Sequence, residues 1–392
     1  MTRPPNTARV SRFASIALPI SFLLLTLRGW RSLDRVPADP GYGWVLRASR
    51  EGLPSVLASD PYFRLHELSV AWIVSLFPIA THAVLLSILS HFAWALGATV
   101  TAWWTLKTVR SVPMAILVGM LVVFAPHAAE SVLGNHGNVR WILLIMLVTI
   151  VSAPPELRSR GFGVGLLAFV NGLSNPVAGI SLLPLAIRSG IERRVHPRDW
   201  ALGGWLAVGV VIQLIQAFTN GFLGGYNTKT SMPWDNMGFF WWSGLLGPLA
   251  ASAATLLLVL IGKRRDVAGL EFPLFITISA LATHAASYLL GGIADRYFVA
   301  PMTLTLVSFV LAVHLLTEHH RRLRRISFLI FVVMATVPTS KWFSSSNYLA
   351  SGPEWSEEVR RARSLCEIDQ KSILDLSLSS HGAQRLTCDD IL

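Results

Sequence analysis

Residues 161–190 read GFGVGLLAFVNGLSNPVAGISLLPLAIRSG, and the way this stretch folds decides the course of the whole chain. Two apolar runs, 161–173 and 176–187, are separated by Asn171-Gly172-Leu173-Ser174-Asn175-Pro176. Pro lacks the amide proton that a continuing helix needs, and Asn and Gly favour turns. The stretch is therefore either a hairpin of two short helices or one long broken helix.

The chain around this stretch is too apolar for a water-soluble domain of its length. It has 392 residues, of which 53% are hydrophobic and only 14% are charged, whereas soluble domains have roughly 25% charged residues. Continuous apolar runs alternate with short Arg and Lys clusters, which indicates a helical bundle in lipid rather than a β-barrel. The net charge of +11 then belongs to basic loops between spans, not to a nucleic-acid-binding surface.

The apolar runs predict an all-α, polytopic bundle with about eleven transmembrane helices. Residues 1–340 form this domain, with a first extracytoplasmic loop at 29–81 whose apolar stretch, Leu68–Pro78, lies on the membrane. Residues 341–392 form an extracytoplasmic tail with a short helix at 354–365. We place the spans at 13–28, 82–106, 111–126, 139–153, 161–173, 176–187, 200–218, 239–261, 270–289, 298–317 and 326–340.

The positions of the basic residues favour the hairpin. With a hairpin, the basic clusters at the helix ends all face the cytoplasm, whereas a single pass moves those from Arg188 onward outside. The protein then lies in the inner (plasma) membrane with its N-terminus cytoplasmic and its C-terminus extracytoplasmic. Its only two cysteines, Cys366 and Cys388, lie in the external tail, where an even pair predicts a disulfide; free thiols are the alternative.

Four short motifs accompany the predicted spans. They are Ala38-Asp39-Pro40-Gly41-Tyr42-Gly43-Trp44, Gly134-Asn135-His136-Gly137-Asn138-Val139-Arg140-Trp141, Gly172-Leu173-Ser174-Asn175-Pro176 followed by Leu182-Leu183-Pro184-Leu185, and Asp295-Arg296-Tyr297-Phe298 with Pro301. By their order and spacing, the chain resembles the GT-C superfamily of integral membrane glycosyltransferases, and more closely a group of poorly characterised actinobacterial membrane proteins of the same plan. The resemblance covers most of residues 10–340. It implies a GT-C-like fold and a polyprenyl-phosphate-linked sugar donor used on the extracytoplasmic face.

Asp39 is the catalytic base that the resemblance implies, since an acceptor hydroxyl must lose its proton as it attacks the anomeric carbon. Asp39 also fits a turn with Pro40, and Asp34 and Asp60 are alternative bases. Many members of the superfamily carry two adjacent acids in the first loop, whereas both neighbours of Asp39 are uncharged. Use of a divalent metal and a non-catalytic role therefore both stay open.

Arg296 is the expected ligand of the departing phosphate, because a guanidinium binds phosphate through paired hydrogen bonds, and Tyr297 stands beside it. The alternative for Arg296 is an anchor at the membrane interface. Arg140 and Lys229 are second candidates for the phosphate.

Asn135, His136 and Asn138 are candidates for binding sugar hydroxyls, because amides and imidazole both donate and accept hydrogen bonds. The alternative is a polar loop with a helix N-cap at Asn138. Glu130, just before them, is either a second carboxylate of the site or a solvated charge. The single histidines on apolar runs lack metal-ligand spacing, so we assign no metal site.

The leading hypothesis is thus a membrane glycosyltransferase that moves a sugar from a lipid-linked donor to an envelope glycan or lipid acceptor. The runner-up is a transporter or flippase of a lipid-linked or small polar substrate, and a non-catalytic GT-C-like scaffold is the third possibility. Transporters often show internal repeats and ionisable residues at mid-membrane. No repeat is evident here, and the charged candidates lie in loops, which favours chemistry at the outer surface.

Overall fold

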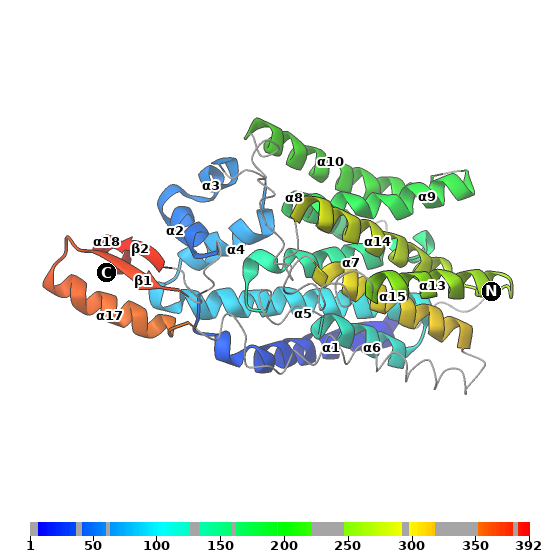
Figure 1. Cartoon of the computed structure of the whole chain (residues 1–392), viewed down its shortest axis with the longest axis horizontal. Coiled ribbons are helices and arrows are strands. Elements are labelled where there is room, and N and C mark those ends of the chain that lie inside the picture. The colour runs from blue at the N-terminus through cyan, green and yellow to red at the C-terminus, as the bar shows by residue number, and fades with distance from the viewer. Residues whose placement is uncertain are drawn as a thin grey trace.

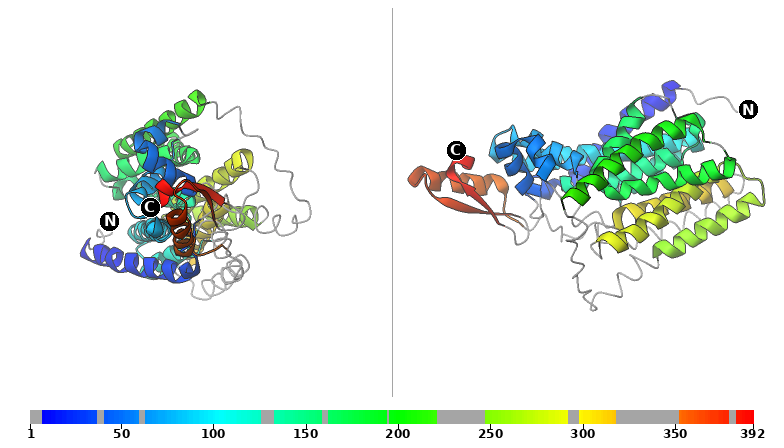
Figure 2. Two further views of the ribbon diagram at one scale, coloured as in Figure 1. Left: turned by 90° about the vertical axis from the view of Figure 1, so that its left-hand side faces the viewer. Right: turned by 90° about the horizontal axis from the view of Figure 1, so that it is seen from above.

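A computed structural model describes residues 7–36, 41–59, 63–125, 133–158, 162–193, 195–220, 247–291, 298–317, 352–378 and 383–392. Figure 1 shows an elongated molecule with a helical bundle towards the N-terminus and a smaller part that holds the C-terminus at the opposite end. The right-hand view of Figure 2 shows the same separation of bundle and C-terminal part.

The bundle consists of long apolar helices that lie side by side (Figures 1 and 2). Four of the described helical segments are long and apolar enough to span a bilayer, Ser11–Arg28, Ile79–Val109, Pro197–Thr219 and Val299–Thr317, which indicates a membrane protein. The described helices of the bundle are α1 (Thr7–Arg28), α5 (His82–Val109), α6 (Val112–Val123), α7 (Arg140–Ser152), α8 (Phe162–Ser174), α9 (Leu182–Glu192), α10 (Pro197–Thr219), α13 (Gly247–Lys263), α14 (Glu271–Gly291) and α15 (Val299–Thr317).

The expected spans between 13–28 and 298–317 each coincide with one of these helices, with ends that differ by a few residues. The run at 176–187 folds as a 3₁₀ segment, η5 (Pro176–Ser181), followed by α9. The last expected span, 326–340, and the start of the run at 239–261 lie outside the described residues. The number of crossings and the sidedness of the membrane stay predictions.

The centre of the bundle is α7, whose residues from Trp141 to Ser152 are all buried. A helix that is apolar all round must be surrounded by other helices. The helix ends at Ser152 because Ala153 is extended and two prolines, Pro154 and Pro155, follow it.

The stretch 161–190 turns back on itself, as the charge pattern predicted. The turn begins at Asn175, which is extended, as residues before proline usually are, and whose Oδ1 accepts from the amide of Val177 at 3.0 Å. Arg158 precedes α8 and Arg188 lies in α9, yet both bind Asp199 in the first turn of α10. The start of α8 and the end of α9 are therefore at the same end of the bundle, which confirms the hairpin.

We call Arg158, Arg188 and Asp199 the base clasp. The three side chains are buried, with nitrogen–oxygen distances to Asp199 of 2.6 Å from Arg158 and 3.3 Å from Arg188. Both arginines also donate to Ala153 O, at 2.9 and 3.2 Å, where α7 leaves its last carbonyls without helical partners. The positive charge at this C-terminal helix end also matches the helix dipole.

Helices α8 and α10 cross closely at two glycines. A Cβ on Gly172 would lie 3.1 Å from the Cα of Gly209, and a Cβ on Gly209 would lie 2.7 Å from Phe169 O. Small residues at such a crossing let two membrane helices approach and gain dispersion contacts. This crossing places the turn at Asn171–Pro176 beside α10.

The smaller part of the molecule combines two segments that are far apart in the sequence. The first loop contributes α2 (Gly41–Glu51), α3 (Leu53–Ser59) and α4 (Leu65–Ser75), and the C-terminal tail contributes α17 (Trp355–Ile368) and α18 (Cys388–Ile391). Buried residues of both segments, among them Val45, Leu68 and Trp355, form one hydrophobic core that is separate from the core of the bundle. We call the described tail residues, 352–378 and 383–392, the cap.

The cap also contains a two-stranded antiparallel sheet that the sequence analysis did not predict. Strand β1 (Ile373–Ser377) pairs with β2 (Ala383–Thr387), with Leu374 opposite Leu386. Each strand is only five residues long and buries a single side chain fully. The alternation of apolar and polar residues that marks a strand is therefore too short to recognise in the sequence. The fold is therefore predominantly helical, as expected, with this hairpin of strands added.

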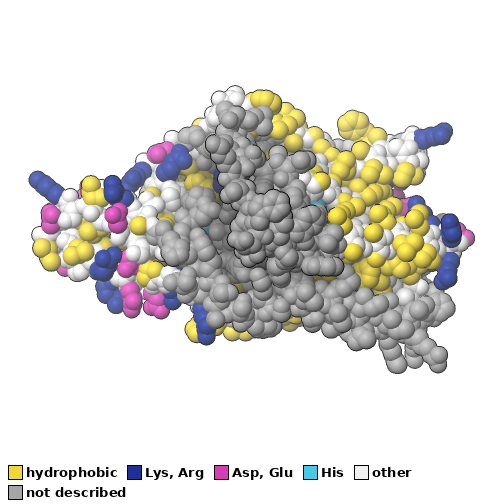
Figure 3. All heavy atoms as spheres, viewed as in Figure 1, with side chains coloured by type: hydrophobic (Ala, Val, Ile, Leu, Met, Phe, Trp, Pro, Cys, Tyr) yellow, Lys and Arg dark blue, Asp and Glu magenta, His cyan; other side chains and the backbone are white. Residues whose placement is uncertain are grey.

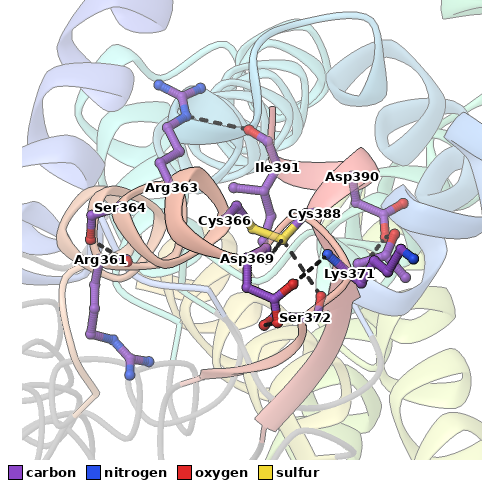
Figure 4. The surroundings of a disulfide bond; sticks show 11 residues. Arg361, Arg363, Ser364, Cys366, Asp369, Lys371, Ser372, Cys388, Asp390 and Ile391 are labelled. Atoms are coloured by element: carbon purple, nitrogen blue, oxygen red, sulfur yellow. Dashed lines mark hydrogen bonds between the residues drawn. A yellow bond between two sulfur atoms is a disulfide. The ribbon is translucent and has the colours of Figure 1, made fainter.

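Cys366 and Cys388 form a disulfide within the cap, with an S–S distance of 2.02 Å and a Cα–Cα distance of 5.5 Å (Figure 4). This is the pair that the sequence analysis expected to join. Both sulfurs are enclosed in the shared core, where the bond ties α17 to α18.

The surface agrees with a bundle that lies in lipid. On the face shown in Figure 3, hydrophobic side chains cover the described helices of the bundle, while charged side chains gather on the cap and at the far end of the bundle. Leucine, isoleucine and tryptophan side chains of the bundle helices, such as Trp200, Ile215 and Leu260, are exposed. Apolar side chains over the helices and charged side chains at the ends are the pattern that lipid contact requires.

Candidate functional site

A buried charged pair lies where the N-terminus of α7 meets α4. Glu67 of α4 is fully buried, and its Oε1 lies 3.9 Å from Nη1 of Arg140, the first residue of α7. Each charge by itself would be costly at such a place, so the two stabilise one another. The pair marks a polar centre at the boundary between the bundle and the first loop.

Two histidines flank this pair. His136, in the 3₁₀ turn η3 (His136–Asn138) before α7, is fully buried, and neither ring nitrogen has a hydrogen-bond partner among the described residues. The enclosed Nδ1 of His66, next to Glu67, also has none within the described part of the chain. Burial lowers the pKa of His66 to about 4, so its imidazole is neutral at pH 7 and can both donate and accept.

Trp44 of α2 packs against one of these two histidines, His136. Its ring meets the ring of His136 edge-on at 5.8 Å between centroids, and the guanidinium of Arg64 lies 4.7 Å from the centre of the Trp44 ring. A cation over an aromatic face is favourable, and more so away from water. We call His66, Glu67, His136, Arg140, Trp44 and Arg64 the junction site.

The turn at Asn171–Pro176 joins the junction site through α4. The amide of His66 donates to Oγ of Ser174 at 3.0 Å, which satisfies one of the amides that the first turn of α4 leaves open. Gln213 of α10 donates from Nε2 to Phe63 O at 2.9 Å. Two motifs from the sequence, at Gly134–Trp141 and Gly172–Pro176, are thus brought together by the segment 63–67.

Four of the predicted site residues are described, and they lie together at this place. Asn135, His136 and Asn138 are buried, and Arg140 forms the pair with Glu67. Oδ1 of Asn135 accepts from the amide of Gly137 at 3.0 Å, so the residue that caps the 3₁₀ turn is Asn135, whereas the sequence analysis considered Asn138 for a cap.

The remaining predicted residues fall elsewhere. Asp39, Arg296 and Tyr297 lie outside the described residues, as do the alternatives Asp60, Glu130 and Lys229. Asp34, another alternative base, instead binds the cap, since the amide of Ser356 donates to its carboxylate at 3.3 Å. This satisfies an amide in the first turn of α17 and gives Asp34 a structural role.

The sequence analysis did not consider His66, Glu67 or Arg64. A usable signal was present, because Glu67 directly precedes the apolar stretch Leu68–Pro78 that was expected to lie on the membrane. An ionisable residue at the edge of an apolar segment is costly unless it has a function or a partner. Its partner Arg140 is 73 positions further along the chain, which only the tertiary structure shows.

The described residues contain no group of three or more His, Cys, Asp or Glu side chains placed to hold a metal ion. What the junction site does offer is a carboxylate beside a guanidinium, with imidazole nitrogens that have no hydrogen-bond partner among the residues that the structure describes. A carboxylate can take a proton from a hydroxyl, and imidazoles suit the binding of hydroxyl groups, which both donate and accept.

Fold and site together define a predominantly helical membrane protein with a buried polar centre between its bundle and a disulfide-bonded cap. No protein-family model matches the chain, and no curated protein matches it.

Proposed function

We infer that the protein is a membrane glycosyltransferase that moves a sugar from a polyprenyl-phosphate-linked donor to an envelope acceptor on the extracytoplasmic face. The observation that carries this inference is the Glu67–Arg140 pair, with nitrogens of His66 and His136 near it that have no hydrogen-bond partner within the described residues. The site lies at one end of an apolar bundle, where a donor with its lipid tail in the bilayer would present its sugar.

In the proposed reaction, the hydroxyl oxygen of the acceptor attacks the anomeric carbon of the donor sugar. The new glycosidic bond forms as the bond between that carbon and the phosphate oxygen breaks, and the phosphate leaves on its lipid carrier. A carboxylate takes the hydroxyl proton. Glu67 is the described carboxylate that fits this role, and Asp39 is the candidate from the sequence.

The neighbouring groups have separate tasks in this proposal. Arg140 holds the carboxylate of Glu67 and adds positive charge near the departing phosphate. His66 and His136 bind and orient sugar hydroxyls, because a neutral imidazole has one donor and one acceptor nitrogen. The buried setting excludes water, which would otherwise compete as the acceptor.

The test is sugar transfer by the purified protein in lipid nanodiscs with polyprenyl-phosphate-linked donors. We expect Glu67→Gln to lower the transfer rate by about 100-fold or more, because removal of a general base typically costs that much. Glu51→Gln is the matched control, since Glu51 lies on α2 with a side chain that is 42% exposed. The transfer rate of Asp39→Asn is measured in the same assay.

The outcomes separate the hypotheses. Full activity of Glu67→Gln with loss in Asp39→Asn would assign the base to Asp39 and remove Glu67 from the reaction. Movement of a labelled lipid-linked substrate across the bilayer without a covalent product would identify a transporter or flippase instead. A wild-type protein that neither transfers nor transports any donor of a broad panel would leave the scaffold as the function.

A further inference from the structure

Helix α2 touches the junction site on one side and the cap on the other. Tyr42 and Trp44 are two residues apart, so their side chains project roughly 200° apart around the helix axis. The ring centroid of Tyr42 lies 4.6 Å from that of Trp355 in the cap, whereas the ring centroid of Trp44 lies 5.8 Å from that of His136. The rotation and position of α2 therefore decide how Trp44 meets the junction site.

The rotation of α2 is held by a chain of hydrogen bonds from Tyr42. Nε2 of His82 lies 2.8 Å from Phe77 O, and because a carbonyl only accepts, this nitrogen carries the proton. In the neutral ring, Nδ1 then accepts, and the hydroxyl of Tyr42 donates to it over 3.1 Å. These bonds hold the beginning of α2, so the end of the helix needs contacts of its own.

The cap holds α2 and the first loop at several points. Arg50, near the end of α2, donates from Nε to Oδ1 of Asp390 at 3.0 Å. Trp355 is fully buried against Tyr42 and donates from Nε1 to Ile79 O at 2.7 Å. The cap thus contacts the beginning of α2 through α17 and the end of α2 through α18.

The disulfide joins the two cap helices that make these contacts. Cys366 belongs to α17, which carries Trp355, and Cys388 begins α18, which carries Asp390 (Figure 4). A segment of about 40 residues rarely holds its own fold without a cross-link. The bond therefore keeps both contacts with α2 in one rigid unit.

We propose that the disulfide-bonded cap is a positioning element of the junction site, which holds α2 so that Trp44 packs against His136 and Arg64. The cap residues act through Trp44 and do not touch the reacting groups themselves. The consequence for sugar transfer rests on the proposed function, but the consequence for packing of the junction site does not.

The first experiment is a double-mutant cycle on sugar transfer. We expect the variant Cys366→Ala with Cys388→Ala to lower the transfer rate by about 100-fold, because a small misplacement at a site can cost that much. Trp44→Ala lowers it by a similar factor. In the combined variant the two losses do not multiply, because the cap acts through Trp44.

Arg50→Gln is a milder perturbation than removal of the disulfide, because it leaves the disulfide and the fold of the cap intact. Half of the Arg50 side chain is exposed, so its loss weakens the contact between α2 and α18 without opening the core. We expect a smaller fall in transfer of the same kind, which is again absent in the Trp44→Ala background. A full multiplication of losses in both cycles would overturn the route through Trp44.

The second experiment measures packing of the junction site without any activity assay. Ser174, which binds the amide of His66, and Ser152, at the base clasp, are both 1% exposed, so Ser174→Cys and Ser152→Cys form a matched pair. Each is labelled with N-ethylmaleimide, with the disulfide present or replaced by alanines. The two native cysteines are the only others and are absent or oxidised in these proteins.

We expect loss of the disulfide to raise the labelling rate of Ser174→Cys and to leave that of Ser152→Cys unchanged, because only the junction site depends on the cap. An unchanged rate at Ser174→Cys, or an equal rise at both positions, would overturn the proposal. If no donor supports transfer by the wild-type protein, the proposed function fails while the labelling result still decides on the positioning role.

Discussion

The two ends of α7 carry buried ion pairs whose nitrogen–oxygen distances and surroundings differ. At its C-terminal end, the base clasp places Asp199 against two arginines at 2.6 and 3.3 Å, and those arginines also bind the last carbonyls of the helix. At its N-terminal end, the nitrogen–oxygen distance of the Glu67–Arg140 pair is 3.9 Å, and buried imidazole nitrogens have no partner among the described residues.

This difference indicates a structural role for the base clasp and a chemical role for the junction site. The base clasp pairs its carboxylate with two arginines that also bind helix carbonyls, so its role is to hold α7, α9 and α10 in place. The junction site instead buries imidazole nitrogens that have no partner in the described part of the chain; such nitrogens cost stability, and a cost of this kind is typical of functional sites. The ends of one helix of about 20 Å thus combine a structural anchor with a candidate reaction centre.

The largest expected effect is on the base clasp. Asp199→Asn leaves Arg158 and Arg188 buried without a counter-charge, and we expect it to lower the free energy of unfolding by about 3 to 5 kcal/mol. Thermal unfolding of the protein in detergent measures this. Asp375→Asn is the control, because its pair with Arg385 is exposed and contributes little. Equal stability of the two variants would refute the structural role of the clasp.

A smaller loss of stability is expected at the crossing that connects the two ends. In Gly172→Ala, the new Cβ would lie 3.1 Å from backbone atoms of Leu206, Gly209 and Val210, and overpacking of this kind costs about 1 to 3 kcal/mol. Gly163→Ala, in the same helix, meets nothing within 4 Å. Unfolding in detergent should show a clear loss for the first variant and none for the second, because alanine favours a helix more than glycine does. A loss in both variants would contradict overpacking at the crossing as the cause.

The junction site should respond in activity more than in stability. His136→Phe removes the open nitrogens, and we expect sugar transfer to fall about tenfold, the equivalent of one neutral hydrogen bond. His91→Phe is the matched control, because His91 is also fully buried with no partner for either nitrogen among the described residues, but it lies beside Gly29. Equal losses in both variants would show that the fall reflects packing and not chemistry.

The smallest effect is on the pH dependence of stability. Burial lowers the pKa of His66 to about 4, below its ordinary value of 6.5. Between these values the unfolded chain binds a proton that the folded chain does not, so the free energy of unfolding falls as the pH falls from 6.5 to 4. Melting temperatures of wild type and His66→Gln, measured across this range, should diverge, with a flatter profile for the variant. Parallel profiles would contradict the burial of this imidazole.

A second group allows the pH effect to be assigned. Burial raises the pKa of Asp390, but hydrogen bonds from Arg50 and Thr387 outweigh it and hold the pKa below its ordinary value of 3.8. Its contribution to stability is therefore present above pH 3.8 and is lost below that value. A change between pH 6.5 and 4 therefore does not come from the contact between α2 and the cap, and the part of it that His66→Gln removes belongs to His66.

Local patterns made much of the bundle predictable. Apolar runs marked α1, α5, α10 and α15 because a spanning helix depends on the hydropathy of its own residues. The basic residues predicted the hairpin at Asn171–Pro176, and the meeting of Arg158 and Arg188 at Asp199 confirms it. The strands β1 and β2 were missed because each is short and half-buried.

The candidate site was predictable only in part. Asn135, His136, Asn138 and Arg140 were recognised because they interrupt apolar sequence in a short polar motif. Glu67 and His66 were missed because their meaning depends on Arg140 and His136, which are about 70 positions away. Trp44 was only the last residue of the motif 38–44 until the structure placed its ring against His136.

By itself, the sequence determined that the chain is a membrane protein, where the helices of its bundle lie to within a few residues, and that the two tail cysteines can join, since these properties depend mostly on nearby residues. Only the tertiary structure decided that the tail shares one core with the first loop and that α2 lies between this cap and Glu67. The physical reason is that side-chain burial and charge pairing across about 300 residues depend on packing in three dimensions, which no local pattern encodes.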